Sequence, residues 1–201
     1  MFVKVCGLST PESVREAVDA GADAVGFVLT ASPREVSPEQ VRILLPLVPA
    51  GVHAVGVFRN ETAADAVAAA KAAGLNWVQL HGHRTADDVK TVHDAGMRLI
   101  RAVTMGASQE EFADLGEEMF LVDAAVPGSG ESWDYASVRT KGIDGREWLL
   151  AGGLEPGNVA FAATAAGAWG VDVSSGVEAS RGVKDLAKIR AFVHAAKTAG
   201  P

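Results

Sequence analysis

The sequence has little cysteine: Cys6 is the single one among 201 residues. One cysteine excludes an internal disulfide framework and any zinc site built from several cysteines, and it is typical of a reducing compartment. Apolar runs are also short, because Gly, Asp or Arg interrupts them well before the ~20 residues that span a bilayer. The opening stretch MFVKVCGLST lacks the basic start and small-residue cleavage site of a secretory signal peptide. We therefore expect a cytoplasmic globular protein without a membrane span.

Basic residues are outnumbered, with 18 Lys and Arg against 25 Asp and Glu, so the formal net charge is −7. No Lys/Arg cluster is longer than two residues, whereas nucleic acid and anionic membranes need a concentrated basic surface. A small molecule is therefore the expected partner. The length favours one domain spanning residues 1–201, at roughly 150 residues per domain. A hydrophobic content of 48% rules out a disordered chain.

One signal recurs along the chain. Helix-like stretches end in Ala-Gly or a close variant and pass at once into a short apolar run, at Gly21, Gly74, Gly96 and Gly167. Each of these glycines is placed to end a helix in the left-handed conformation. Their separations of 53, 22 and 71 residues are close to two, one and three units of about 24 residues. Eight such units fill the chain, which predicts an α/β protein with a single (β/α)8 TIM barrel of eight parallel strands.

An open, doubly wound sheet is the main alternative, since it also alternates strand and helix. The chain has no G-x-G-x-x-G opening, which favours the closed barrel. Short β-branched runs predict strands at Phe2–Cys6, Ala24–Leu29, His53–Phe58, Trp77–Leu80, Arg98–Val103, Met119–Val122, Glu147–Leu150 and Gly170–Val173. Helices are expected between them at Pro11–Ala20, Pro38–Leu47, Thr62–Ala73, Ala86–Ala95, Ser108–Leu115, Asp134–Val138, Asn158–Ala165 and Lys184–Thr198.

Polar residues on the predicted strands indicate a site at one end of the barrel. Alternate strand residues point into the barrel and toward the helices, so Lys4 and Cys6 point inward. The same alternation, with Ile100 and Ala102 taken as outward, directs a set of polar residues to the C-terminal mouth: Gln79, His81, Arg101, Asp123, Asp172 and Ser174. Enzymes of this fold place their active sites there. For any single one of these residues the alternative is a structural role in a buried polar network, for instance with Lys4 paired to Asp172.

Glycine-rich turns follow the seventh and eighth predicted strands. Ala151-Gly152-Gly153-Leu154 precedes a helix, and Ser174-Ser175-Gly176-Val177 closes the last strand. Backbone N–H groups exposed at such turns bind phosphate, and these two loops are the usual phosphate site of the barrel. The sequence therefore predicts a phosphorylated ligand, with two tight turns that bind nothing as the alternative.

Short motifs in a fixed order carry a resemblance over residues 3 to about 190. They are Lys4-Val5-Cys6-Gly7, Gly26-Phe27-Val28, Ser32-Pro33-Arg34, Val55-Gly56-Val57-Phe58, Gln79-Leu80-His81-Gly82, Leu121-Val122-Asp123, Pro127-Gly128-Ser129-Gly130, Leu150-Ala151-Gly152-Gly153-Leu154, Asp172-Val173-Ser174-Ser175-Gly176-Val177-Glu178 and Gly182-Val183-Lys184-Asp185. This set resembles the phosphoribosylanthranilate isomerases of tryptophan biosynthesis. The resemblance implies an Amadori rearrangement of N-(5-phosphoribosyl)anthranilate to 1-(2-carboxyphenylamino)-1-deoxyribulose 5-phosphate.

The resemblance also assigns roles. Cys6 is implied as the general base and Asp123 as the general acid, with no metal or organic cofactor because the imine of the opened sugar is the electron sink. Arg34 matches the arginine that meets the anthranilate carboxylate, a role that suits a planar fork of donors. Phosphate would be held by Gly152, Gly153, Ser174, Ser175 and Gly176. Supporting positions are Lys4, His81, Arg101 and Asp172.

The proposed acid and base need different environments. A thiol with a pKa of about 8.5 is mostly protonated at pH 7, and Lys4 would favour the thiolate of Cys6. Asp123 must be protonated when the ring opens, so its pKa should be raised by burial or by a neighbouring anion. Trp133 would either stack on the anthranilate ring or act as a hydrophobic plug.

Several features depart from the family pattern. The loop at residues 29–34 is about one residue shorter than usual, His83 replaces an acidic residue and Trp133 replaces Phe, which could change substrate preference. Alternative functions are another phosphosugar isomerase, such as the aminoaldose isomerase of the histidine pathway, a non-catalytic phosphate sensor and a thiol redox protein. The phosphoribosylanthranilate isomerase is favoured over these alternatives by Cys6, Asp123 and the lack of a resolving cysteine. The expected assembly is a monomer or a homodimer.

Overall fold

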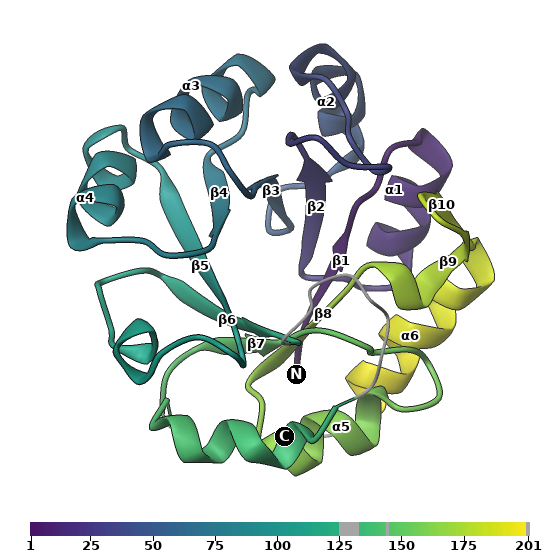
Figure 1. Cartoon of the computed structure of the whole chain (residues 1–201). Helices are drawn as coiled ribbons and strands as arrows, with labels where there is room; N and C mark the ends of the chain where they lie inside the picture. The colour runs from purple at the N-terminus through teal and green to yellow at the C-terminus, as the bar shows by residue number, and fades with distance from the viewer. Residues whose placement is uncertain (125–132, 144, 200–201) are drawn as a thin grey trace.

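The computed structural model describes residues 1–124, 133–143 and 145–199. Eight parallel strands within these residues form one closed barrel in chain order, surrounded by helices (Figure 1). They are β1 (Phe2–Cys6), β2 (Ala24–Val28), β3 (His53–Phe58), β4 (Trp77–His81), β5 (Arg98–Thr104), β6 (Met119–Asp123), β7 (Trp148–Leu150) and β8 (Gly170–Val173). Pairing of β8 with β1 closes the barrel. The predicted TIM barrel is confirmed, and the open sheet is excluded.

Helices begin where the sequence carries capping residues. The side chains of Thr10 and Ser37 accept the backbone N–H groups of Ser13 and Gln40, ahead of α1 (Pro11–Asp19) and α2 (Pro38–Leu44). The other helices are α3 (Ala63–Ala73), α4 (Ala86–Asp94), α5 (Val159–Ala166) and α6 (Leu186–Thr198). The glycines after α1, α3, α4 and α5 all have positive φ, as predicted. None of the helices in the described ranges is long and apolar enough to cross a membrane.

The fifth and sixth units differ from the prediction. The helix expected at 108–115 is only a short 3-10 turn, η2 (Gln109–Phe112), and the sixth unit carries the 3-10 helix η3 (Tyr135–Lys141). Weak apolar periodicity explains both, because the turn around Glu110 and Glu111 offers the barrel a single buried side chain, Phe112.

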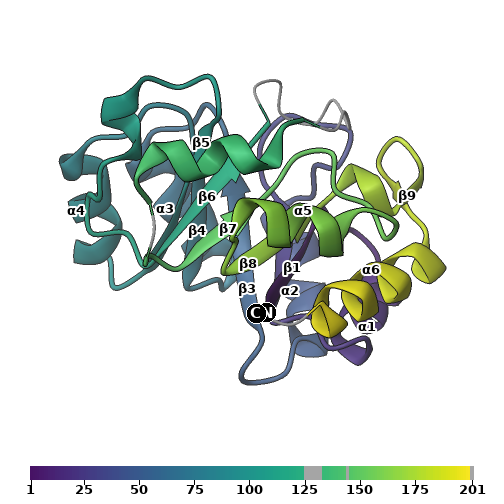
Figure 2. The same ribbon diagram turned by 90° about the horizontal axis from the view of Figure 1, so that it is seen from below.

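The last helix begins two residues later than expected, at Leu186. Asp185 is its N-cap and accepts the backbone N–H of Lys188 at 3.1 Å. The preceding residues form β10 (Val183–Lys184), which pairs antiparallel with β9 (Glu178–Ser180) in a small separate sheet. In Figures 1 and 2 this hairpin lies at the edge of the barrel, close to α6. Lys184 therefore belongs to the loop region after β8 and not to the helix.

Two hydrophobic layers follow from the strand alternation. The barrel interior is packed by Cys6, Ala24, Val28, Val55, Val57, Trp77, Ile100, Ala102, Met119, Leu121, Leu149 and Ala151. The outer layer between strands and helices includes Val3, Val5, Val171 and Val173. Strands β1, β4, β6 and β8 thus face as predicted. In β5 the prediction is wrong, since Ile100 and Ala102 point inward.

Arg101 therefore faces outward, away from the barrel mouth. Its guanidinium donates to the carbonyls of Glu111, at 2.7 Å, and Ala113, and it pairs with the Glu117 carboxylate at 2.9 Å. Glu117 is also paired with Arg146, and both guanidiniums stack on the Phe120 ring at 4.7 and 4.4 Å. This ion-pair cluster lies beside η2, the short turn found where the fifth helix was expected. Arg101 is a structural residue and not a site residue.

Candidate active site

The polar strand ends surround a cavity at the C-terminal mouth of the barrel. It is lined by Cys6, Val28, Ser32, Arg34, Val57, Arg59, Gln79, His81, Asp123, Asp172 and Ser174. A second cavity shares Asp123, Asp172 and Ser174 with the first and extends along Gly152, Gly153 and Ser175. A thiol, a carboxyl group and two glycine-rich turns thus face connected space. The predicted site residues that line these two cavities are Cys6, Arg34, His81, Asp123, Gly152, Gly153, Asp172, Ser174 and Ser175. Gly176 lines an adjoining cavity, and Lys4 is fully buried and bonded to Asp172.

A larger cavity, about 660 Å³, lies at the opposite end of the strands, where Met1, Phe2 and Trp169 line it. Its two charged side chains are already engaged. Asp23 accepts from Lys197 Nζ at 2.6 Å, and the Arg139 guanidinium donates to carbonyls at the end of α5. We therefore place the chemistry at the C-terminal mouth.

Cys6 ends β1 and is buried beside a charged pair. Lys4 Nζ, fully buried two residues earlier, donates to Asp172 Oδ1 across the β1–β8 seam at 2.9 Å. Burial raises the pKa of the Cys6 thiol above its ordinary value, and the positive charge of Lys4 opposes this only in part. The expectation that Lys4 would favour the thiolate is right in direction, but burial outweighs it in the free protein. The buried Lys4–Asp172 pair, which the sequence offered as an alternative to a site, is present and is itself part of the site.

Asp123 ends β6 on the same mouth. Burial raises the pKa of its carboxyl group to about 6, while a hydrogen bond from the backbone N–H of Ala124, at 2.8 Å, and the charge of Arg59 act in the opposite direction. The nearby Asp172 carboxylate adds to the increase. The pKa of Asp123 is therefore raised as the sequence predicted. A carboxyl group with this pKa can hold and release a proton near neutral pH.

His81 and Gln79 form a neutral polar pair at the end of β4. Burial, together with the charge of Lys4, lowers the pKa of His81 to about 3, so its ring is neutral near pH 7. Gln79 Nε2 lies 2.7 Å from His81 Nε2. The buried Gln79 Oε1 has no hydrogen-bond partner among the described residues, which leaves it available to a ligand hydroxyl. His81 is thus suited to orient a ligand and not to carry a charge.

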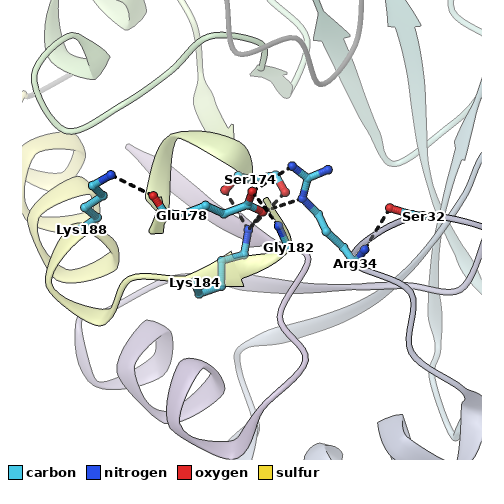
Figure 3. A network of polar contacts seen from close by, with 7 residues as sticks. All are labelled: Ser32, Arg34, Ser174, Glu178, Gly182, Lys184 and Lys188. Atoms are coloured by element: carbon cyan, nitrogen blue, oxygen red, sulfur yellow. Dashed lines mark hydrogen bonds and ion pairs between the residues drawn. The ribbon is translucent and has the colours of Figure 1, made fainter. Parts of the chain in front are cut away.

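Arg34 reaches the same cavity from the loop after β2. Its Nε and Nη2 donate to the two oxygens of Glu178, at 2.6 and 3.1 Å. Glu178 also accepts from Lys184 Nζ at 3.1 Å and from the backbone N–H of Gly182 at 3.1 Å (Figure 3). The shortened loop therefore still delivers Arg34 to the site. No role was assigned from the sequence to Glu178, Lys184 or Arg59, although Glu178 and Lys184 lie in motifs that carry the family resemblance.

The turns after β7 and β8 pack against each other. A Cβ atom on Gly176 would lie 1.8 Å from the carbonyl oxygen of Leu154, so only glycine fits there. The backbone N–H groups of Gly152, Gly153, Ser175 and Gly176 have no acceptor among the described residues. Lys188 on α6 lines the adjoining cavity with Gly153 and Gly176, and its ammonium group donates to the carbonyl oxygen of Glu178 at 2.8 Å. Free N–H groups beside a cation form an anion site.

Trp133 is fixed against the first of these turns. Its indole N–H donates to the carbonyls of Ala151 and Gly152 at 3.3 and 3.2 Å, and its ring lies 5.0 Å from that of Tyr135. This packing fits a plug over β7, and it leaves the predicted aromatic stacking untested. The motif at residues 127–130 lies outside the described residues.

Comparisons with known proteins identify the family of this chain. The family model for N-(5′-phosphoribosyl)anthranilate (PRA) isomerase matches residues 3–195. An N-(5′-phosphoribosyl)anthranilate isomerase from Streptococcus mutans is 40% identical over 195 residues, which cover 97% of this chain and 98% of the relative. The crystal structure of TrpF from Jonesia denitrificans is 42% identical with a TM-score of 0.86, and the match covers 99% of this chain and 98% of that one.

Two further solved structures bear on ligand and assembly. A phosphoribosyl anthranilate isomerase in complex with reduced 1-(o-carboxyphenylamino)-1-deoxyribulose 5-phosphate has a TM-score of 0.83 and 33% identity over 98% of both chains. A structure of monomers generated from the dimeric phosphoribosylanthranilate isomerase of Thermotoga maritima has a TM-score of 0.85 and 33% identity over 98% of both chains. The family match covers nearly the whole chain, and the predicted function is confirmed at this level. The chain belongs to the phosphoribosylanthranilate isomerase family of tryptophan biosynthesis.

Proposed function

We propose that this chain isomerises N-(5-phosphoribosyl)anthranilate with Asp123 as the general acid and Cys6 as the general base. The observation that carries the proposal is the pair itself: a buried carboxyl group with a pKa of about 6 and a buried thiol line one cavity. Adjacent backbone N–H groups supply a phosphate site. Together they match the needs of an anionic sugar substrate.

Asp123 carries out the first step. Its proton passes to the ring oxygen of the furanose as the bond between that oxygen and the anomeric carbon breaks, which leaves a protonated Schiff base at C1′. Because burial keeps part of the Asp123 population protonated near neutral pH, the acid is ready before the substrate arrives. The backbone N–H of Ala124 holds the carboxyl oxygen in place at 2.8 Å.

Cys6 carries out the second step. The thiolate removes the C2′ proton, and the electron pair of that bond moves into the iminium group to give the enol-amine, which becomes the ketone. Burial keeps the thiol protonated in the free protein, so the thiolate forms against that cost. The ammonium group of Lys4 is held beside it by Asp172 and stabilises the thiolate when it forms.

The two anionic ends of the substrate define its orientation. Arg34 receives the anthranilate carboxylate at one end of the cavity. Gly152, Gly153, Ser174, Ser175 and Gly176 receive the phosphate at the other, with Lys188 nearby. No metal or organic cofactor is assigned a role, because the imine itself accepts the electrons.

The fluorescence of freshly prepared substrate tests the proposal. We expect rapid conversion by the wild-type chain and at least about a 100-fold loss of kcat in Cys6→Ser and in Asp123→Asn. Asp94→Asn, which removes an exposed carboxylate bonded to Lys90, should leave the rate unchanged. An inactive wild type, or an Asp123→Asn variant that retains more than a tenth of kcat, would contradict the proposal.

The proposed function includes three further expectations. Residues 1–201 form a single catalytic domain, since the strands close in chain order. The reactive centre depends on a free thiol, which supports a reducing, cytoplasmic location. A monomer or a homodimer remains the predicted assembly, and sedimentation of the purified chain distinguishes the two.

A further inference from the structure

Among the described residues, the Arg34 guanidinium is bonded along one edge only, by Glu178. Glu178 engages the Nε and Nη2 atoms of the guanidinium, at 2.6 and 3.1 Å, in a side-on pair. A guanidinium has five N–H donors in a rigid plane. Nothing in the described part of the chain bonds the edge formed by Nη1 and the second hydrogen of Nη2, so this edge can take a second carboxylate. Arg34 also lines the cavity that contains Cys6 and Asp123.

Glu178 is in turn fixed by more than Arg34. Its side chain is 6% exposed and accepts from Lys184 Nζ and from the backbone N–H of Gly182, both at 3.1 Å. Burial alone would raise the pKa of Glu178, but the hydrogen bond from Arg34 and the charge of Lys184 hold it below its ordinary value. The three side chains Arg34, Lys184 and Glu178 together carry one net positive charge. A ligand carboxylate would neutralise it.

The cluster is also joined to the phosphate turn. Lys184 Nζ donates to the carbonyl oxygen of Ser174 at 2.7 Å and approaches its Oγ at 3.3 Å (Figure 3). The Arg34 side chain passes over Gly7, where a Cβ atom would lie 2.8 Å from Arg34 Cδ and 3.0 Å from Ser174 Oγ. Arg34 is thus confined between the end of β1, the β8 turn and the Glu178 carboxylate.

We propose that Glu178 is a positioning residue that aims the free edge of Arg34 at the carboxylate of the aromatic half of the substrate, and that Lys184 ties Glu178 to the phosphate turn through Ser174. This inference rests on the proposed function for the identity of the ligand. The cluster then fixes the distance between the two anionic ends of the ligand. Loss of Glu178 frees Arg34 to rotate, so recognition of the carboxylate weakens while the phosphate site remains.

Binding of two ligands separates this role from a merely structural one. One ligand is reduced 1-(o-carboxyphenylamino)-1-deoxyribulose 5-phosphate, and the other is the same compound without the ring carboxylate. We expect Glu178→Gln to weaken binding of the first ligand about tenfold or more, the scale of a charge-assisted hydrogen bond, and to leave the second within twofold. KM for the substrate should rise more than kcat falls.

Glu16→Gln is the matched control. Glu16 forms the same side-on pair, with Arg190 Nε and Nη2 both at 2.8 Å, between α1 and α6 on the outside of the barrel. Its substitution should change the binding of neither ligand. A double-mutant cycle supplies the second control: in an Arg34→Ala background, Glu178→Gln should cause no further loss, because Glu178 acts through Arg34.

Each outcome decides the inference. An unchanged ratio of the two affinities in Glu178→Gln, or a loss that adds to that of Arg34→Ala, overturns it. If Glu178→Gln does not fold, Lys184→Met must show the same selective loss for the carboxylate ligand, or the inference is rejected. Since these measurements need no turnover, the two proposals fail separately. A wild type that converts no substrate would reject the proposed function, while a selective loss of the carboxylate ligand in Glu178→Gln would still support this inference.

Discussion

Asp123→Asn should make the protein more stable while removing the proposed general acid. Burial raises the pKa of Asp123 from 3.8 to about 6 in the folded chain, so the ionised carboxylate is less favourable there than in the unfolded chain. A tenfold change in an ionisation constant corresponds to about 1.4 kcal/mol, and ionised Asp123 therefore costs about 3 kcal/mol of stability at pH 7. An asparagine cannot ionise, and its side-chain oxygen can still accept the N–H of Ala124.

The loss of stability caused by ionised Asp123 depends on pH. Between pH 3.8 and about 6 the folded chain binds the proton more tightly than the unfolded chain, so this carboxyl group lowers stability as the pH rises and reaches its full cost above about pH 6. At pH 4.5 most of the carboxyl groups are still protonated in the folded state, and the cost is about 1 kcal/mol. The advantage of Asp123→Asn should therefore grow by about 2 kcal/mol between pH 4.5 and pH 7.

Urea unfolding followed by circular dichroism at both pH values measures this growth. Asp114→Asn is a suitable control, because the exposed Asp114 carboxylate also accepts a backbone N–H, that of Gly116, at 2.8 Å. Comparison of the two variants isolates the effect of burial. An Asp123→Asn advantage that is equal at the two pH values, or a variant less stable than the wild type at pH 7, would show that folding does not raise the pKa of Asp123.

Three other predictions concern separate parts of the molecule. Glu117→Gln should lower the free energy of unfolding by about 3–5 kcal/mol, because it removes the carboxylate that Arg101 and Arg146 share, without changing kcat/KM; thermal unfolding and a rate assay check this. Gly176→Ala should weaken binding of inorganic phosphate at least about tenfold, since the added methyl group displaces the Leu154 carbonyl; calorimetry measures it, and wild-type affinity would contradict the assigned phosphate turn. The His81 ring should stay neutral down to about pH 4, as nitrogen chemical shifts would report, and a titration near pH 6 would refute its buried placement.

Much of the site could be predicted because strand alternation and fold rules act together. In β1 and β8 the outward residues are valines and the inward ones include Lys4 and Asp172, so the alternation has one sensible direction. In β5 both faces are apolar, with Leu99 and Val103 on one side and Ile100 and Ala102 on the other. Alternation alone then cannot tell inside from outside. The choice is made by Glu117, which follows Arg101 by 16 residues and gives it a partner on the outer side.

The Glu178 cluster could not be read from the sequence for a different reason. The two strands that carry Glu178 and Lys184 are three and two residues long, too short for any periodicity to show. Arg34 meets Glu178 across 144 positions of sequence. Their contact depends on the closed barrel and on the path of the loop after β2, neither of which a local pattern encodes.

The Lys4–Asp172 bond has a consequence for how the protein is made. It joins the first and last strands across 168 positions, and Asp123 lies between them in the chain. Reactive centre and barrel seam are therefore completed by the same late event, and a chain still emerging from the ribosome contains Lys4 and Cys6 before Asp123 and Asp172 have been made. A ligand that bridges Arg34 and the β8 turn binds only the closed form, so it drives closure by mass action. Substrate supply would then act as a folding aid for newly synthesised enzyme.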